Sequence, residues 1–324
     1  MSVHLTTNPT LIDIARTEKV DLAQTAAQFA IARSGSVFNF LPFRTKDVWE
    51  WTEQFTLEDA SSQYRALNEE PTRGSGTQKE MQFGMSIMAD RYQLERLLAR
   101  RPEGQKNKAV ELQIKAAGFG FLYNRDFIKG SSLDNPREFD GLQSLFSSHL
   151  VADQTMDTGN IAGAALSLET LNEAMDRVRG GTSIIVMSKS MKRKFQRASE
   201  TAGVGGEFIQ QDKDQFGRPQ PTYNGIPLVT IEDVRNADTI LGYDEVSTFA
   251  GAANSDSTSI YLLNLGEQGF YGAQQFDPMI INHGLVAGTI NVDSTDLEWT
   301  CSLGVGHDQV GVRIGGISDL AIIA

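Results

Sequence analysis

Two stretches of the chain alternate apolar and polar residues with a period of two, which is the pattern of a β-strand with one buried face. They lie within residues 49–57 and 81–87, and the polar stretch between them carries the turn signal Gly74-Ser75-Gly76. We therefore predict an extended β-hairpin over residues 46–89. Because a lone two-stranded hairpin is only marginally stable in water, its apolar face predicts a contact with a neighbouring subunit. The predicted contact residues are Trp49, Trp51, Phe55, Leu57, Met81, Phe83 and Met85.

Helical periodicity follows the hairpin. Asp90 is in a position to cap a helix that contains apolar residues at 94, 97 and 98, and Pro102 and Gly104 then predict an interruption. A longer helix is expected over about residues 106–123. Its apolar stripe consists of Val110, Ile114, Ala117 and Phe121. The segment 130–141 is rich in Ser, Asn, Asp and Pro, and it is expected to be a loop.

The central part of the chain has the pattern of a compact α/β region. Ser167 and Ser188 are placed to cap two helices on either side of a continuous apolar strand at 183–187, and a second strand is expected at 226–231. The last third is mainly β, with strand-like stretches at 260–265, 270–276, 285–292, 297–303 and 310–314. Helices surrounded by strands in this order favour an α+β fold over a doubly wound one.

The first 45 residues read as an arm. Residues 11–15 predict one helical turn and 22–30 a short second helix, and the breaker Ser34-Gly35-Ser36 follows. No further element closes a core here, so the arm is expected to lie on another surface.

Composition narrows the function classes. The chain has 324 residues and a net charge of −12, which disfavours tight binding to duplex nucleic acid but not its enclosure. The single cysteine, Cys301, excludes an internal disulfide and fits a reducing cytoplasm. Neither a signal peptide nor a membrane-spanning apolar stretch is visible, so the protein is expected to be soluble and cytoplasmic when made.

The sequence offers no recognisable reaction centre. The P-loop, G-x-S-x-G, H-E-x-x-H and C-x-x-C motifs are absent, and the four histidines lack ligand-like spacing. The segment from Asp212 to Gly217 only faintly resembles a calcium loop, and a polar surface loop is the favoured interpretation. The basic residues of 189–197 are interpreted as a solvated helix face rather than a nucleic-acid patch. We therefore predict no catalytic, cofactor or metal residues. A cryptic hydrolase using Asp212 or His307 stays as an alternative from another class.

Several short segments, taken in order, resemble the major capsid proteins of tailed bacteriophages, which have the Hong Kong 97 fold. Phe127-Ile128-Lys129-Gly130 followed by Phe139-Asp140-Gly141-Leu142 resembles the end of the family's spine helix and the entry into its central domain. Asn224-Gly225-Ile226-Pro227 resembles its turn into a strand, and Val312-Arg313-Ile314 resembles its closing strand. Each motif alone is weak, and the ordered series from about Phe43 to Ile317 carries the resemblance.

The resemblance implies an α+β fold with an N-terminal arm, an extended β-hairpin loop, a spine helix, a peripheral domain and an axial domain. The implied division is an arm at 1–45, the hairpin at 46–89, the peripheral domain at 90–159, the axial domain at 160–250, a peripheral return at 251–307 and an axial strand at 308–324. It also implies pentamers and hexamers in an icosahedral shell around double-stranded DNA, in a virion assembled in the host cytoplasm.

The expected partners are further copies of the chain, a portal protein and a scaffolding protein, with a decoration protein as an optional addition and no membrane partner. Lys79 is not assigned to an intersubunit crosslink, because it is interpreted as an ordinary solvated lysine. An encapsulin-like compartment, which shares the architecture but carries a protein cargo, is the alternative within the fold. A decoration or tail protein is a third possibility.

Overall fold

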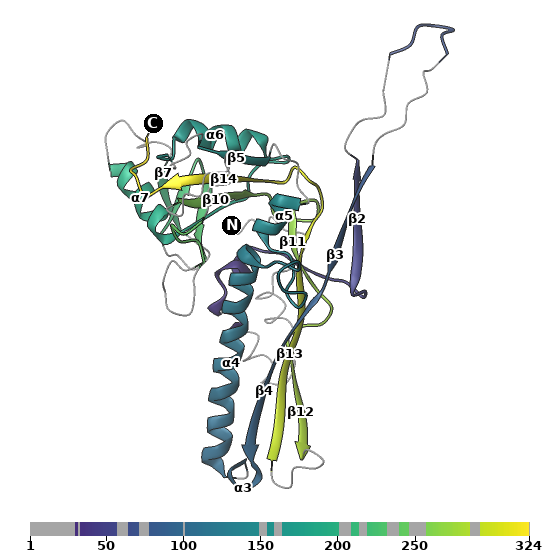
Figure 1. Ribbon diagram of the computed structural model, residues 1–324, viewed down its shortest axis with the longest axis vertical. Coiled ribbons are helices and arrows are strands. Elements are labelled where there is room, and N and C mark those ends of the chain that lie inside the picture. Colours follow the sequence, from purple (N-terminus) through teal and green to yellow (C-terminus); the bar gives the residue numbers. More distant parts are fainter. Residues whose placement is uncertain are drawn as a thin grey trace.

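The computed structural model describes residues 30–31, 33–56, 64–70, 78–99, 101–148, 154–158, 164–200, 209–213, 219–231, 240–245, 257–285 and 292–323. They form a wide upper part, a narrow stem and a hairpin that projects from the upper part (Figure 1). Two large sheets organise the molecule, one running down the stem and one lying in the upper part. Among the described residues, no helix is long and apolar enough to cross a membrane.

The stem is built on one long strand, β13 (Val292–Val305). It pairs antiparallel with three strands, which are β4 (Ser86–Glu95), β11 (Phe270–Gln274) and β12 (Met279–Leu285). The short strand β1 (Phe43–Thr45) completes this five-stranded sheet by pairing parallel with β11. Alternate residues of β13 enter the core, among them Trp299, Cys301 and Leu303, each at most 1% exposed. The clean alternation in the sequence therefore predicted this strand correctly.

The helix α4 (Pro102–Lys129) runs along the stem and packs on the sheet. Its core side consists of Leu112, Ala116, Phe119 and Tyr123, each at most 8% exposed. At its upper end an aromatic cluster joins α4 to β13 and to the segment after the arm. Tyr123 lies 5.4 Å from Trp299 and 4.9 Å from Phe38 of the short helix η1 (Ser36–Asn39), measured between ring centroids.

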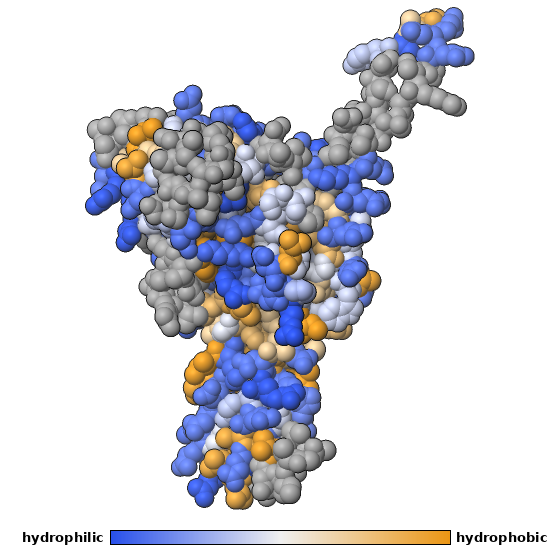
Figure 2. Space-filling model, in the orientation of Figure 1, coloured by the Kyte–Doolittle hydropathy of each residue, from blue (hydrophilic) through white to orange (hydrophobic). Residues whose placement is uncertain are grey.

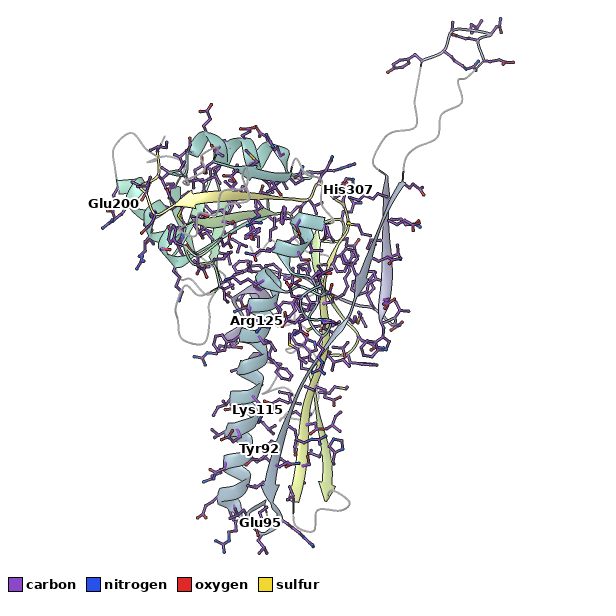
Figure 3. All side chains as sticks on the ribbon, viewed as in Figure 1. Tyr92, Glu95, Lys115, Arg125, Glu200 and His307 are labelled. Atoms are coloured by element: carbon purple, nitrogen blue, oxygen red, sulfur yellow. The ribbon has the colours of Figure 1, made fainter. Side chains whose placement is uncertain are left out.

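Two predictions for this region are wrong. Asp90 does not cap a helix, because β4 continues to Glu95 and only a single turn, α3 (Arg96–Ala99), follows. Asp90 instead accepts a hydrogen bond of 2.7 Å from Lys115 Nζ of α4, and Figure 3 labels Lys115 on the helix beside β4. Pro102 does not interrupt a helix but starts one, because the missing N–H of proline costs nothing in the first turn.

The seven-stranded sheet of the upper part has the order β5-β14-β10-β6-β9-β8-β7. Its strands are β5 (Thr155–Asp157), β6 (Ile184–Met187), β7 (Ile209–Lys213), β8 (Pro219–Tyr223), β9 (Ile226–Thr230), β10 (Ser257–Leu263) and β14 (Gly311–Ser318). Residues of α6 (Leu168–Arg177) and α7 (Lys189–Glu200) pack on one face, and α5 (Leu142–Ser148) packs on the other. Because both faces are covered, every residue of β6 and β10 is buried.

The capping predictions here are confirmed. Ser167 Oγ accepts a hydrogen bond from Glu169 N at the start of α6, and Ser188 Oγ accepts one from Met191 N at the start of α7. The sequence patterns did not predict β1, the part of β4 beyond residue 87, β5, α5 or the β7–β8 hairpin. The expected strand at 285–292 falls mostly outside the described residues. The sheets also differ from the implied division, because β5 and β10 belong to the sheet of β14 rather than to the stem.

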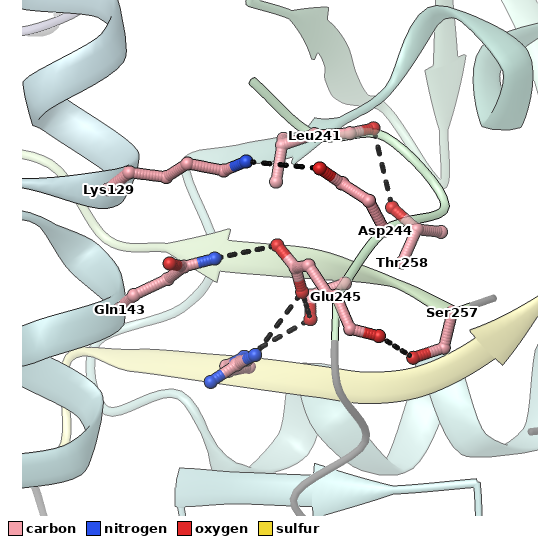
Figure 4. Close-up of polar contacts among 9 residues, drawn as sticks. Lys129, Gln143, Leu241, Asp244, Glu245, Ser257 and Thr258 are labelled. Carbon is pink, nitrogen blue, oxygen red and sulfur yellow. Dashed lines mark hydrogen bonds and ion pairs between the residues drawn. The ribbon is translucent and has the colours of Figure 1, made fainter. Parts of the chain in front are cut away.

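A buried polar cluster joins α5 to the upper sheet (Figure 4). Gln143 of α5 donates a 2.7 Å hydrogen bond to Glu245 Oε1, and Ser259 of β10 donates to Glu245 Oε2. Arg313 of β14 forms a 3.2 Å ion pair with the same carboxylate. Lys129, the last residue of α4, lies 3.6 Å from Asp244 at a more exposed position. Glu245 therefore connects α5, the helix that follows α4, to β10 and β14 of the upper sheet.

Candidate functional site: the hairpin and its base

The projecting hairpin forms a two-stranded sheet of its own. The strands β2 (Glu50–Thr56) and β3 (Gln78–Gly84) pair antiparallel, with Trp51 opposite Phe83 and Thr56 opposite Gln78. This confirms the strands expected from the period-two pattern. The described residues 64–70 lie at the far end of the projection, well away from the body (Figure 1).

The predicted intersubunit contact residues divide into two groups. Trp51, Met81 and Phe83 are only 7%, 2% and 7% exposed, and they belong to the core of their own chain. The argument that their apolar face needs a neighbouring subunit is therefore wrong for these three. The rings of Trp51 and Phe83 stack with their centroids 5.6 Å apart. The body of the same subunit covers the base of the hairpin, which the sequence pattern alone could not distinguish from a neighbour.

The other predicted contact residues have different positions. Trp49, directly before β2, is 49% exposed, and Met85 is partly buried against the core. Phe55 lies in β2 opposite Lys79, but only its backbone is described. Leu57 lies outside the described residues. Trp49 is therefore the best exposed of the predicted contact residues that the structure describes.

A polar chain fixes the hairpin base to β11. Trp51 Nε1 donates a 3.1 Å hydrogen bond to the hydroxyl of Tyr271, which donates a 2.6 Å hydrogen bond to Glu53 Oε1. Lys46 Nζ lies 2.9 Å from the same carboxylate oxygen, and the Arg44 guanidinium lies 4.4 Å from the centre of the Tyr271 ring. Burial alone would raise the pKa of Glu53, but the Tyr271 hydrogen bond and the Lys46 ammonium outweigh it and lower that pKa. Burial and the Glu53 carboxylate raise the pKa of Tyr271.

We predict that this anchor weakens in acid. A carboxylate whose pKa is lower in the folded state than in the unfolded state stabilises the folded state at pH values above the unfolded-state pKa. This stabilisation is lost as the pH falls through the folded-state pKa. Tyr271→Phe should therefore cost about 1.5–3 kcal/mol at pH 7, the range for hydrogen bonds to charged groups, and clearly less near pH 3. Urea unfolding at both pH values measures the difference.

The matched control for this prediction is Tyr223→Phe. The Tyr223 hydroxyl donates a 2.8 Å hydrogen bond to the neutral Asn172 Oδ1, so its loss should cost a similar amount at both pH values. Equal destabilisation by Tyr271→Phe at pH 7 and pH 3 would contradict a role for the Glu53 charge.

A groove lies beside the hairpin base, with a volume of about 610 Å³. One side is formed by the hairpin, including Trp49 and Phe83, and the other by the segment 132–140 that follows α4. Three carboxylates line it, those of Glu50, Glu138 and Asp140. Glu138 pairs with Arg125 at 2.7 Å, and Asp140 accepts hydrogen bonds from Ser132. The groove thus has an exposed indole at its rim and a polar, acidic lining.

The far end of the hairpin presents apolar side chains to solvent. Tyr64 and Leu67 are essentially fully exposed, at 107% and 94%, on a tip whose surface is mostly hydrophilic (Figure 2). A local turn holds this segment together, because Ala66 N donates to Glu69 Oε2 at 2.8 Å and Arg65 donates to the Glu69 carbonyl at 2.9 Å.

Lys79 interacts with the body of its own chain. Its Nζ lies 3.9 Å from Asp308 Oδ2, and the side chain of Asp308 is fully buried. His307, labelled at the upper end of the stem in Figure 3, lies with its Nδ1 3.0 Å from Asp308 Oδ1. Lys79 therefore supplies positive charge to a buried carboxylate, and the interpretation of Lys79 as a simply solvated lysine is wrong.

The residues considered for chemistry do not converge. Burial, and then the charge of Asp126, raise the pKa of the Cys301 thiol well above its usual value, which makes it a poor nucleophile. Asp212 lies in β7, whereas residues 214–217 of the expected polar loop lie outside the described residues. Within the described ranges, no three His, Cys, Asp or Glu residues are grouped as metal ligands would be.

No similar sequence is found for the chain, whereas several solved structures have a similar fold. No protein-family model matches the chain, and no curated protein matches it significantly. The capsid protein of a native GTA particle has a TM-score of 0.61 at 11% identity, over 88% of this chain and 91% of that one. The SrpI encapsulin of Synechococcus elongatus PCC 7942 has a TM-score of 0.59 at 17% identity, over 88% of each chain. A structure from Mycobacterium phage Bobi has a TM-score of 0.54 at 12% identity, over 86% and 89%.

These similarities define the class of fold. The spine helix on a long stem sheet, the upper mixed sheet and the projecting hairpin form the Hong Kong 97 fold of phage major capsid proteins and encapsulins. The α+β class and the fold expected from the ordered sequence segments are therefore confirmed. The identities of 11–17% establish the fold alone.

Proposed function

We propose that this protein is the major capsid protein of a tailed bacteriophage, and that it assembles as pentamers and hexamers into an icosahedral shell around double-stranded DNA. The observation that carries the proposal is the projecting hairpin, whose tip exposes Tyr64 and Leu67 beyond the reach of their own core. The fold shared with phage capsids supports it.

The assembly mechanism follows from the distribution of apolar surface. The hairpin base is fixed to its own body, and the projecting part covers an adjacent subunit. Each contact contributes only a modest binding free energy, but every subunit places its hairpin on one neighbour and is covered by the hairpin of another. Symmetric repetition therefore makes the shell stable. Trp49, at the rim of the groove, is a second contact point for a neighbouring chain.

Further partners follow from this role. A portal protein and a scaffolding protein, with or without a decoration protein, would complete the particle, and the product resides in the virion after assembly in the host cytoplasm. The net charge of −12 is compatible with a shell that encloses DNA without binding it tightly. No enzymatic activity is part of the proposal, which rests on shell formation alone.

Electron microscopy and sedimentation of the chain, expressed alone in bacteria, test this function. We expect closed hollow particles or a pool of pentamers and hexamers. Trp49→Ala should leave the melting temperature nearly unchanged, because the side chain is half exposed, and should reduce the yield of particles. A chain that stays monomeric at every concentration, even when co-expressed with a scaffolding protein, would overturn the proposal.

An encapsulin-like compartment is the second candidate function. The similarity to the SrpI encapsulin, with 17% identity, favours it. The content of native particles distinguishes the two functions. Packaged double-stranded DNA supports the capsid, whereas a single enriched cargo protein and no DNA supports the compartment.

A further inference from the structure

Two connections between the stem sheet and the upper sheet pass side by side. Residues 264–269 lead from β10 to β11, and residues 306–310 lead from β13 to β14. Hydrogen bonds of 2.9 Å, donated by the backbone N–H groups of Asn264 and Gly306, join one connection to the other. A Cβ at Gly306 would lie 2.8 Å from the backbone of Gln268, so the two segments are in direct contact. We call these two segments the crossing.

Asp308 places a carboxylate in the interior of the crossing. Its side chain is fully buried, and within the described part of the chain neither of its oxygens accepts a hydrogen bond. Taking a charge out of water in this way is strongly unfavourable unless a countercharge lies close by. Lys79 Nζ lies 3.9 Å from Oδ2, and His307 Nδ1 lies 3.0 Å from Oδ1. Because lysine is a cation at neutral pH, the buried carboxylate depends on Lys79 for its countercharge.

Lys79 belongs to a part of the hairpin that lies beyond its apolar base. It stands in β3 opposite Phe55, four residues from Phe83. In an extended strand this spacing corresponds to about 13 Å. The contact with Asp308 therefore connects the hairpin to the crossing at a point well outside the stack of Trp51 on Phe83.

The crossing is also tied to the segment that follows α6. Arg179 Nη1 donates a 2.6 Å hydrogen bond to His307 Nε2, since arginine can only donate. The backbone N–H of Arg179 donates a second hydrogen bond, of 2.8 Å, to the Gln309 carbonyl oxygen. Through His307 and Asp308, a continuous series of polar contacts thus joins the upper part to the hairpin. Figure 3 labels His307 at the upper end of the stem, where this series passes.

We propose that Asp308 couples the position of the hairpin to the crossing between the two sheets. When the hairpin moves away, Lys79 leaves and the carboxylate stays buried without its countercharge. Opening of the crossing relieves this unfavourable state, because it lets water reach Asp308. Movement of the hairpin therefore loosens the connections between the stem and the upper part. This coupling belongs to the single subunit and does not rest on the proposed shell.

Hydrogen exchange of the full chain, compared in one assembly state, tests the coupling. The amide protons of Asn264 and Gly306 bond across the crossing, so their exchange rates report its opening. Lys79→Met removes the cation and keeps an apolar side chain of similar length, and we expect exchange at both amides to become about tenfold faster. The matched control is Glu80→Gln, because the exposed Glu80 accepts its hydrogen bond from Gln54 within the hairpin. This control should exchange at the parent rate.

Two outcomes of this experiment would overturn the proposal. Faster exchange confined to the hairpin in Lys79→Met would show that Lys79 only anchors the hairpin. Asp308→Asn, added to Lys79→Met, removes the uncompensated charge and should return both crossing amides to within about twofold of the parent rate. Rates that stay high in this double variant would show that the loosening does not come from a buried charge.

The coupling must also act in the opposite direction, because coupling free energies are reciprocal. Arg179→Met should therefore speed exchange in β2, residues 50–56, by about threefold. Arg179 is exposed, so this variant tests the proposal even where Lys79→Met does not fold. Arg177→Met is the matched control, because Arg177 pairs with Glu173 at 2.6 Å on α6. Equal exchange of the hairpin in the two arginine variants would contradict the coupling.

Discussion

Subunits in which residues 57–77 are replaced by Asn-Gly are expected to fold normally and to form no closed shells. Thr56 and Gln78 face each other in the hairpin ladder, and an Asn-Gly pair is the preferred two-residue connection between such strands. Tyr64 and Leu67 are lost, but they are fully exposed and contribute nothing to the core. The free energy of unfolding should change by less than about 1 kcal/mol, as for surface changes generally.

The measurement combines thermal unfolding with electron microscopy of the same preparation. A matched variant, Tyr64→Ser with Leu67→Ser, keeps the length of the hairpin and removes only its apolar tip. We expect this variant to assemble less than the parent and more than the shortened chain. Normal shells from the shortened chain would contradict the role of the hairpin in assembly, whereas a lowered melting temperature would show that the hairpin serves the fold instead.

The hairpin also shows what sequence patterns can and cannot establish. The alternation at 49–57 and 81–87 predicted both strands, because a period of two is a local property of the backbone. The same alternation says that one face is buried but not what buries it. Trp51 and Phe83 are covered by their own body through Tyr271, which is 220 residues from Trp51 in the sequence. No local pattern carries that information.

Tertiary ion pairs explain the missed strand β4. Its inward positions include Met88, Asp90 and Tyr92, so a charged residue stands where the pattern requires an apolar one. The carboxylate of Asp90 is accommodated by Lys115 of α4 at 2.7 Å. In the sequence pattern, Asp90 therefore appeared to end the strand and to cap a helix. Conversely, the stripe of α4 was identified correctly as apolar, and only the structure shows that it is the face turned away from the sheet.

The ordered segments near Gly130, Gly141 and Asn224 predicted the fold where single elements failed. These positions need special backbone geometry or close approach. Asn224 has φ of 50° and Gly225 has φ of 79° in the turn between β8 and β9. A Cβ at Gly141 would collide with the Asp126 carbonyl oxygen. Such requirements limit the residue types at each of these positions. The positions can therefore be recognised in the sequence even where the apolar residues differ.

Removal of the Glu245 carboxylate is expected to destabilise the junction between α5 and the upper sheet strongly. In Glu245→Ala, the Arg313 guanidinium loses its countercharge while its side chain is only 11% exposed. Breaking a buried pair from one side typically costs about 3–5 kcal/mol, because the remaining charge stays desolvated. Gln143 of α5 loses its partner as well. We therefore expect a lower midpoint of unfolding in urea.

A double-mutant cycle separates the ion pair from simple loss of packing. Arg313→Met removes the cation and keeps an apolar side chain of similar length, so Glu245→Ala with Arg313→Met should lose less free energy than the sum of the single variants. A coupling of about 1–3 kcal/mol is expected for contacting residues. The exposed helical pair Glu173–Arg177 of α6, at 2.6 Å, is the control, and Glu173→Ala should cost at most about 0.5 kcal/mol. Strict additivity at Glu245 and Arg313 would show that the two side chains act independently. In that case the junction would be held by the apolar contacts between α5 and β10, such as that of Phe146 with Tyr261 at 5.7 Å.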